Sequence, residues 1–337
     1  MQEAMYYAPQ QKDKKVQCVL CPRHCVINKG ETGFCRARQN QNGKLFSLVY
    51  GKATGLQIDP IEKKPLYHFL PGSAVLSFGT LGCNLVCAHC QNWTTSQAEP
   101  QKGHSYSITP EEIVERAVLE HCESIAYTYN EPTIFYEYML DTAKLAKTKG
   151  IKNVLVSNGF IEKEPLIELC KYMDAANIDL KSIENKFYQK ISGAWIQPIL
   201  EAMKTIQQKK VWLEVTNLVI PKLNDKPSQI KQLIAWIKTN LGKEVPLHFS
   251  AFFPAYKLND LRPTDAATLL TARKTALKQG LKYVYIGNIG TTNEENTHCS
   301  KCKKLLIQRV GYNIIVNEIK KGKCSCGQKI AGVWQTI

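Results

Sequence analysis

Three cysteines that follow a predicted strand have the spacing of a metal-binding loop. Cys83, Cys87 and Cys90 form a C-x3-C-x2-C sequence directly after the strand expected at residues 74–80. A closed zinc site takes four ligands, whereas three thiolates can hold three irons of a [4Fe-4S] cluster and leave the fourth iron open to a cofactor or substrate. We therefore predict an open cluster at this loop. A zinc site completed by a distant cysteine is the alternative.

A second set of cysteines lies near the amino terminus. Its members follow the pattern C-x2-C-x3-C-x9-C: Cys18, Cys21, Cys25 and Cys35. Four thiolates suit either a zinc ion or a second iron-sulfur cluster, and the spacing does not choose between these metals. A metal-free state is disfavoured because such an extension has little apolar core of its own.

A third set of cysteines lies near the carboxyl terminus. Cys299 and Cys302 form one pair, and Cys324 and Cys326 form another. A hairpin is expected between the pairs, at residues 310–319. Two pairs arranged in this way are typical of a zinc ribbon, in which four thiolates bind one ion. We predict zinc at these four residues.

The loops that carry these cysteines must be positioned by the surrounding elements. Short apolar or β-branched runs alternate with helical patterns, which indicates βαβ units and a parallel sheet. One helix start is marked by Thr109, Pro110 and Glu112, which give an N-cap, a proline at the first position and a capping box. The strands are expected at residues 74–80, 124–129, 152–157, 175–180, 211–220, 247–252 and 283–286.

Six or seven such units favour an α/β fold with a barrel or partial barrel. The flanking segments differ in character from this core. We therefore predict three modules: a cysteine-rich N-terminal extension at residues 1–72, a β/α core at residues 73–289, and a small zinc-ribbon-like module at residues 290–337.

Polar residues follow three neighbouring strands of the predicted core. Because β/α barrels build their sites at the carboxyl ends of the strands, these residues are expected near the cysteine loop. They are Asn130 and Glu131, Ser157 and Asn158, and Asp179 and Lys181. His248, on a later strand, could face the barrel interior.

The C-x3-C-x2-C loop and these strand ends resemble the radical S-adenosylmethionine (SAM) superfamily, with a partial (β/α)6-type barrel. The segments at residues 127–132, 156–159 and 179–181 resemble the SAM-contacting segments of the pyruvate formate-lyase activating enzyme group. The segment at residues 64–72 and the N-terminal cysteine pattern resemble the radical SAM member of the AmmeMemoRadiSam group.

The resemblance implies that the cluster of Cys83, Cys87 and Cys90 reductively cleaves SAM to a 5'-deoxyadenosyl radical. The six strand-end residues and His248 are then expected to contact the cofactor. An electron donor such as flavodoxin or ferredoxin is implied, and Memo-like and AMMECR-like proteins are candidate partners. Two features depart from the family patterns: His89 replaces the usual aromatic residue before the third cysteine, and residues 247–254 lack an Arg and a His.

Composition sets broad limits on the function. The chain of 337 residues has 44% hydrophobic residues and a formal net charge of +15, which suits RNA, an anionic substrate or an acidic protein. No apolar run is long enough to span a membrane and the first residues do not resemble a secretory signal, so we expect a cytoplasmic protein. We predict a radical SAM enzyme acting on a macromolecular substrate. The alternatives are an activase of a glycyl-radical enzyme and a zinc-bearing RNA- or protein-binding factor.

Overall fold

A curved nine-stranded sheet forms the centre of the molecule in the computed structural model, which describes residues 2–10, 13–290 and 293–335. Seven of its described strands are parallel and run in the order β15-β14-β13-β12-β11-β10-β8. They are β8 (Ala74–Gly79), β10 (Ser124–Tyr127), β11 (Lys152–Ser157), β12 (Ala175–Asp179), β13 (Trp212–Val219), β14 (Leu247–Ala251) and β15 (Val284–Gly287). These are the seven strands expected from the sequence.

Two antiparallel strands extend the sheet beyond β8. β7 (Lys52–Pro60) pairs with β8, and β9 (Tyr106–Ser107) pairs with β7. β7 therefore joins the core sheet although it lies within the predicted N-terminal extension. Among the described residues β15 pairs only with β14, so the sheet is a partial barrel with two edges. The α/β class and the partial barrel are confirmed.

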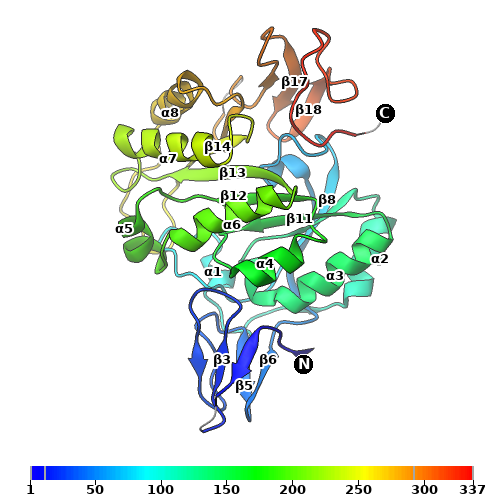
Figure 1. Ribbon diagram of the computed structural model, residues 1–337, viewed down its shortest axis with the longest axis vertical. Helices are drawn as coiled ribbons and strands as arrows, with labels where there is room; N and C mark the ends of the chain where they lie inside the picture. Colours follow the sequence, from blue (N-terminus) through cyan, green and yellow to red (C-terminus); the bar gives the residue numbers. More distant parts are fainter. Residues whose placement is uncertain (1, 11–12, 291–292, 336–337) are drawn as a thin grey trace.

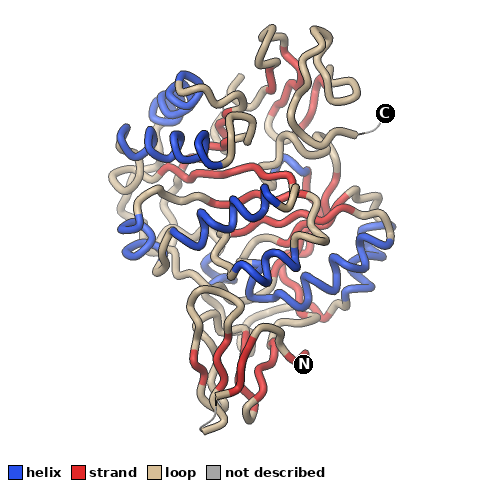
Figure 2. Tube along the Cα trace, in the orientation of Figure 1, coloured by secondary structure: helices blue, strands red, loops and turns tan. Residues whose placement is uncertain are grey.

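Helices connect the parallel strands and cover the outer face of the sheet (Figures 1 and 2). The larger ones are α2 (Pro110–Leu119), α3 (Tyr136–Thr148), α4 (Lys163–Leu169), α6 (Gln197–Gln208), α7 (Pro227–Asn240) and α8 (Ala266–Lys278). Shorter turns are η1 (Ile61–Lys63), α1 (Trp93–Ser96), η2 (Pro132–Phe135), α5 (Asn185–Phe187) and the π-helical turn η3 (Tyr188–Ser192). The capping box predicted for α2 is present, because Thr109 and Glu112 each accept a hydrogen bond from the other's backbone N–H.

The amino end of the barrel is closed by apolar side chains from the segment after β7. Ile61, Leu66 and Phe69 are fully buried against residues at the starts of the strands, such as Val75 and Val154. Burial of each large apolar side chain stabilises the fold by about 1.5–3 kcal/mol, so these contacts keep the amino end of the barrel closed. The interior of the barrel is therefore accessible from the carboxyl end.

Two small β modules lie at opposite ends of the long axis (Figure 1). The N-terminal module contains two three-stranded antiparallel sheets formed by β1 (Gln2–Glu3), β2 (Tyr7–Pro9), β3 (Val16–Cys18), β4 (Val26–Ile27), β5 (Arg38–Gln41) and β6 (Lys44–Ser47). The C-terminal module is one antiparallel sheet of β16 (Thr297–His298), β17 (Leu305–Val310) and β18 (Asn313–Asn317). Across the described residues, no helix combines the length and apolar character that a bilayer span requires.

Candidate active site

The C-x3-C-x2-C loop connects the carboxyl end of β8 to the short helix α1. Cys83 and Cys87 are buried, and Cys90 is half-buried. The Cys90 Sγ lies 3.2 Å from the Ser96 hydroxyl oxygen. The loop therefore brings three thiols to the open end of the barrel, as the sequence predicted.

The turn η3 holds the middle of this cysteine loop. The backbone N–H of Val86 donates to the carbonyl of Ser192 at 3.1 Å, and that of Ala88 donates to the carbonyl of Ile191 at 2.8 Å. Gly193 follows with φ +62°, and a Cβ there would lie 2.6 Å from a Val86 methyl group. A glycine is needed at this position because it both adopts the left-handed conformation and permits the close approach.

Asn130 fixes the start of the loop. Its Oδ1 accepts from the Thr80 N–H at 3.1 Å, and its Nδ2 donates to the Thr80 hydroxyl at 3.1 Å and to the Gly82 carbonyl at 2.9 Å. The side chain thus links the end of β10 to the residues before Cys83 by hydrogen bonds.

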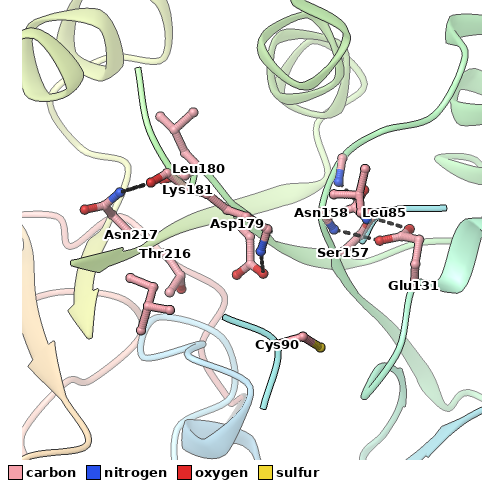
Figure 3. A network of polar contacts seen from close by, with 12 residues as sticks. Leu85, Cys90, Glu131, Ser157, Asn158, Asp179, Leu180, Lys181, Thr216 and Asn217 are labelled. Carbon is pink, nitrogen blue, oxygen red and sulfur yellow. Dashed lines mark hydrogen bonds and ion pairs between the residues drawn. The ribbon is translucent and has the colours of Figure 1, made fainter. Parts of the chain in front are cut away.

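Glu131 lies beside Asn130 and is buried. Its carboxylate accepts four hydrogen bonds, from the N–H and hydroxyl of Thr133, the hydroxyl of Ser157 and the N–H of Asn158, at 2.7–3.0 Å. Burial raises the pKa of Glu131, although these donors partly counter it. The contact ties the end of β10 to the end of β11 (Figure 3).

Asn158 extends this hydrogen-bond network to the cysteine loop. Its Nδ2 donates to the Oδ1 of Asn84 at 3.0 Å, and the Nδ2 of Asn84 donates to the Phe160 carbonyl at 2.8 Å. Because Asn84 follows Cys83 directly, the strand ends and the thiol loop form one hydrogen-bonded unit.

Asp179 and Lys181, at the end of β12, form the other polar group of Figure 3. The Lys181 Nζ lies 2.8 Å from the Asp179 Oδ2, and the Lys181 carbonyl accepts from the Asn224 Nδ2 at 2.6 Å. Burial disfavours the Lys181 ammonium, but Asp179 and the nearby Cys87 outweigh this and raise the pKa of Lys181. A lasting positive charge therefore lies next to the thiol loop.

The side chains around the loop fit an iron-sulfur cluster with a bound organic cofactor. Three thiols come from one loop, which suits a cluster with one open iron. His89 is 5% exposed, and its Nδ1 has no hydrogen-bond partner among the described residues. Burial, assisted by Lys181, lowers the pKa of His89 to about 3, so the imidazole is neutral. A buried polar atom without a partner is costly and indicates that another group completes the site.

His248 is not brought to this group of residues. It is the second residue of β14, and its Nε2 lies 2.6 Å from the Glu214 carboxylate. The rings of Tyr67 and Tyr285 pack against it with centroids 4.8 Å and 5.2 Å away. Burial alone would raise the pKa of Glu214, but the contact with His248 lowers it. The cofactor contact predicted for His248 has no support in this arrangement, because the residue is enclosed near the amino end of the barrel.

The C-terminal cysteines converge on one point. The four Sγ atoms of Cys299, Cys302, Cys324 and Cys326 all lie within 4.8 Å of one another, and the pairs 299–326 and 302–324 are 3.7 Å and 3.6 Å apart. This set, the C-terminal quartet, can hold a metal ion. The N-terminal cysteines, the N-terminal quartet, line a cavity on the other side of the molecule, against the thiol loop.

Sequence reasoning missed two arginines near the thiols, of which Arg23 contacts the thiol loop. Arg23 donates to the carbonyls of Asn84 and Gly193 at 2.6 Å and 2.5 Å, and Arg38 is buried beside Cys18. The only available signal was their place in the sequence: Arg23 lies between Cys21 and Cys25, and Arg38 follows Cys35 by three residues. These contacts join segments far apart in the chain, so periodicity could not reveal them.

Comparison with known proteins agrees with this geometry. Residues 78–237 match the profile of the radical SAM superfamily. The chain is 48% identical to the uncharacterized protein MJ0808 of Methanocaldococcus jannaschii, over 98% of this chain and 99% of that one. It is 23% identical to the pyruvate formate-lyase-activating enzyme of Clostridium pasteurianum, over 60% of this chain and 87% of that one.

The fold also has a counterpart among solved structures. A radical SAM methyltransferase from Sphaerobacter thermophilus superposes with a TM-score of 0.51 at 13% identity, covering 65% of this chain and 67% of that chain. At this identity the likeness concerns the fold alone. The three-thiol loop, the profile match and this fold agree. The chain is an enzyme of the radical SAM superfamily, related to the pyruvate formate-lyase activating enzymes.

Proposed function

We propose that this enzyme reductively cleaves SAM at the cluster of Cys83, Cys87 and Cys90 and abstracts hydrogen from a macromolecular substrate. The observation that carries the proposal is the single hydrogen-bonded unit formed by the thiol loop and the ends of β10 and β11. When bound, the [4Fe-4S] cluster would supply the electron that cleaves SAM, and this cleavage would give a 5'-deoxyadenosyl radical.

The strand-end residues are proposed to hold SAM. Asp179 has a side chain that is 41% exposed and offers carboxylate oxygens to the cofactor, while Lys181 keeps that carboxylate in place. Ser157 and Asn158, whose side chains bond to Glu131 and Asn84, are proposed to contact the ribose or carboxylate of SAM from the end of β11. Asn130 and Glu131 act mainly by positioning in this proposal, because their polar atoms already bond to the protein.

A large substrate is supported by the open form of the sheet and by exposed aromatic side chains beside the thiol loop. Trp93, in α1, is 43% exposed, and its ring stacks on that of Tyr256 at a centroid distance of 5.3 Å. Phe253, just after β14, is also 43% exposed. Exposed aromatic residues at the mouth of a site are suited to contact a polypeptide or a nucleic acid.

The electron is proposed to come from flavodoxin or ferredoxin. The sequence similarity to a pyruvate formate-lyase-activating enzyme supports one alternative, an activase that forms a glycyl radical on a partner protein. Memo-like and AMMECR-like proteins are proposed partners on the family resemblance. An RNA or an acidic protein remains a proposed substrate because of the net charge of +15.

Zinc is proposed at the C-terminal quartet. Zinc–sulfur bonds of about 2.3 Å at tetrahedral angles place neighbouring sulfurs about 3.8 Å apart. The observed separations of 3.6 Å and 3.7 Å are close to that value. All four positions around the ion would then be filled, which suits a structural role.

The proposed function is tested by measuring SAM cleavage in anaerobically purified protein with a strong reductant. Cys83→Ala, Cys87→Ala and Cys90→Ala should each reduce the cleavage rate to that of the solution without enzyme, because each removes a thiolate from the cluster. The matched control is Cys170→Ala, which removes a buried thiol far from the loop in sequence. A wild-type rate in any of the three variants would refute the proposal. A radical on a glycine of a co-expressed partner would instead favour the activase.

A further inference from the structure

The N-terminal quartet lines one cavity with two arginines. Cys18 ends β3, Cys21 and Cys25 lie in the turn between β3 and β4, and Cys35 precedes β5. The backbone N–H of Cys18 donates to the Cys25 carbonyl at 2.9 Å, which folds this turn back on itself. All four thiols are free, and all four border the same cavity. A cavity with four thiols is a site for a metal cofactor.

The separation of the thiols argues against a single ion. In the part of the chain that the structure describes, the C-terminal quartet is the only group of three or more ligand residues whose atoms all lie within 4.8 Å of one another. No three Sγ atoms of the N-terminal quartet therefore approach as closely as one tetrahedral zinc ion requires. In a [4Fe-4S] cluster each thiolate binds a different iron, so the thiolates stand farther apart.

The remaining walls of the cavity suit an anionic cluster. Leu20 and Ile27 are apolar and exclude water. The Arg38 side chain is 2% exposed, and its Nη1 lies 3.8 Å from the Cys18 Sγ. Its Nε has no hydrogen-bond partner within the described part of the chain. Arg23 also borders the cavity. Guanidinium groups next to thiolates stabilise their negative charge, and N–H donors directed at sulfur tune the reduction potential of a cluster.

This cavity is next to the loop that carries Cys83. Asn84 belongs to both, since it lines the cavity and follows Cys83 in the loop. A Cβ at Gly82 would lie only 2.4 Å from the Cys35 carbonyl oxygen, so the two segments pack backbone to backbone. A metal centre in the cavity would therefore be a close neighbour of the SAM-binding cluster.

We propose that Cys18, Cys21, Cys25 and Cys35 hold a second [4Fe-4S] cluster, enclosed between the N-terminal module and the thiol loop. A protein thiolate binds each of the four irons, so this cluster has no open site for SAM. Its chemistry is electron transfer. The proposal goes beyond the proposed function and does not depend on the reaction at the barrel cluster.

The test uses full-length protein purified and reconstituted with iron and sulfide without oxygen. The variant Cys83→Ala/Cys87→Ala/Cys90→Ala should keep one cluster equivalent of iron, and its reduced-state paramagnetic resonance spectrum should not change when SAM is added. The proposal is overturned if this variant binds no iron and the zinc content rises to two ions per chain. If the triple variant does not fold, Mössbauer spectra and zinc analysis of the wild type decide between two clusters and one.

A reciprocal variant separates this inference from the proposed function. Cys21→Ala/Cys25→Ala should lose one cluster equivalent and retain a spectrum that responds to SAM. The control Cys122→Ala/Cys170→Ala removes two thiols outside the quartets and should keep the wild-type iron content. A wild-type iron content in Cys21→Ala/Cys25→Ala would overturn the inference. Absence of any SAM-responsive signal in the wild type would instead refute the proposed function, whatever iron the N-terminal quartet holds.

Discussion

The two terminal modules each contain a quartet of cysteine thiols, yet the modules meet the barrel at opposite ends and their thiols are spaced differently. The N-terminal quartet is spread around a cavity beside the thiol loop, while the C-terminal quartet gathers its four Sγ atoms within 4.8 Å. Each module is also anchored by one fully buried arginine, Arg38 or Arg309. The separation of the thiols, more than their number, therefore distinguishes the two proposed metal centres.

The contacts of Arg38 and Arg309 attach the two modules to different ends of the barrel. Arg38 forms an ion pair with Glu137 in α3, next to the ends of β10 and β11. Arg309 donates to the carbonyls of Glu295 and Tyr67 at 2.9 Å and 2.8 Å, on the closed side of the barrel. The N-terminal module is therefore positioned to affect the chemistry, and the C-terminal module to support the closed end.

The strongest of the expected effects comes from removing the zinc ion proposed at the C-terminal quartet. Structural zinc contributes an apparent free energy of about 10–16 kcal/mol in small zinc domains, so a chelator should unfold β16–β18 locally. SAM cleavage should persist, because the quartet lies at the end of the molecule away from the thiol loop. Hydrogen exchange of the module and SAM cleavage are measured on the same sample. Loss of cleavage while the barrel cluster is intact would contradict the comparison.

The sequence allowed the seven parallel strands and all three cysteine sets to be predicted, because each leaves a local pattern. Runs of apolar residues mark the strands, and the short spacings between cysteines mark the loops. The position of Asn130 and Glu131 at the strand ends was also predictable, since parallel strands bring their carboxyl ends to one edge, whereas the SAM contact predicted for them stays a prediction.

What could not be predicted depends on contacts between distant segments. A histidine on a barrel strand can face either end of the interior, and only Glu214 and Tyr67, which come from other segments, fix His248 near the closed end. The pairing of β7 with β8 was missed because β7 is antiparallel and lies within the cysteine-rich region. The choice between zinc and a cluster at the N-terminal quartet depends on the distances between its thiols. Those distances are set only when the chain folds.

An intermediate effect is expected when the N-terminal anchor is broken. Arg38→Met leaves the Glu137 carboxylate buried without its partner and should lower the free energy of unfolding by about 3–5 kcal/mol. The matched control is Lys304→Met in the C-terminal module, whose Nζ lies 3.2 Å from Glu318 with both side chains nearly half exposed. That exposed pair should contribute about 0–1 kcal/mol. Urea unfolding measures both, and equal losses would show that Arg38 is not an anchor.

The third expected effect, the smallest, is a pH dependence at the closed end of the barrel, where His68 lies. His68 is fully buried, with its Nδ1 2.6 Å from the Ala331 carbonyl and its Nε2 2.5 Å from the Tyr285 hydroxyl. Burial lowers the pKa of His68 to about 4, against about 6.5 in the unfolded chain. The unfolded state therefore binds a proton that the folded state does not, so stability should fall as the pH falls from about 6.5 to about 4. His68→Gln should reduce this slope, whereas the exposed His104→Gln should leave it unchanged. Hydrogen exchange at pH 7 and pH 5 locates the effect: faster exchange in β16–β18 than in β3–β6 is expected, and the reverse order would assign the pH-sensitive contact to the N-terminal module.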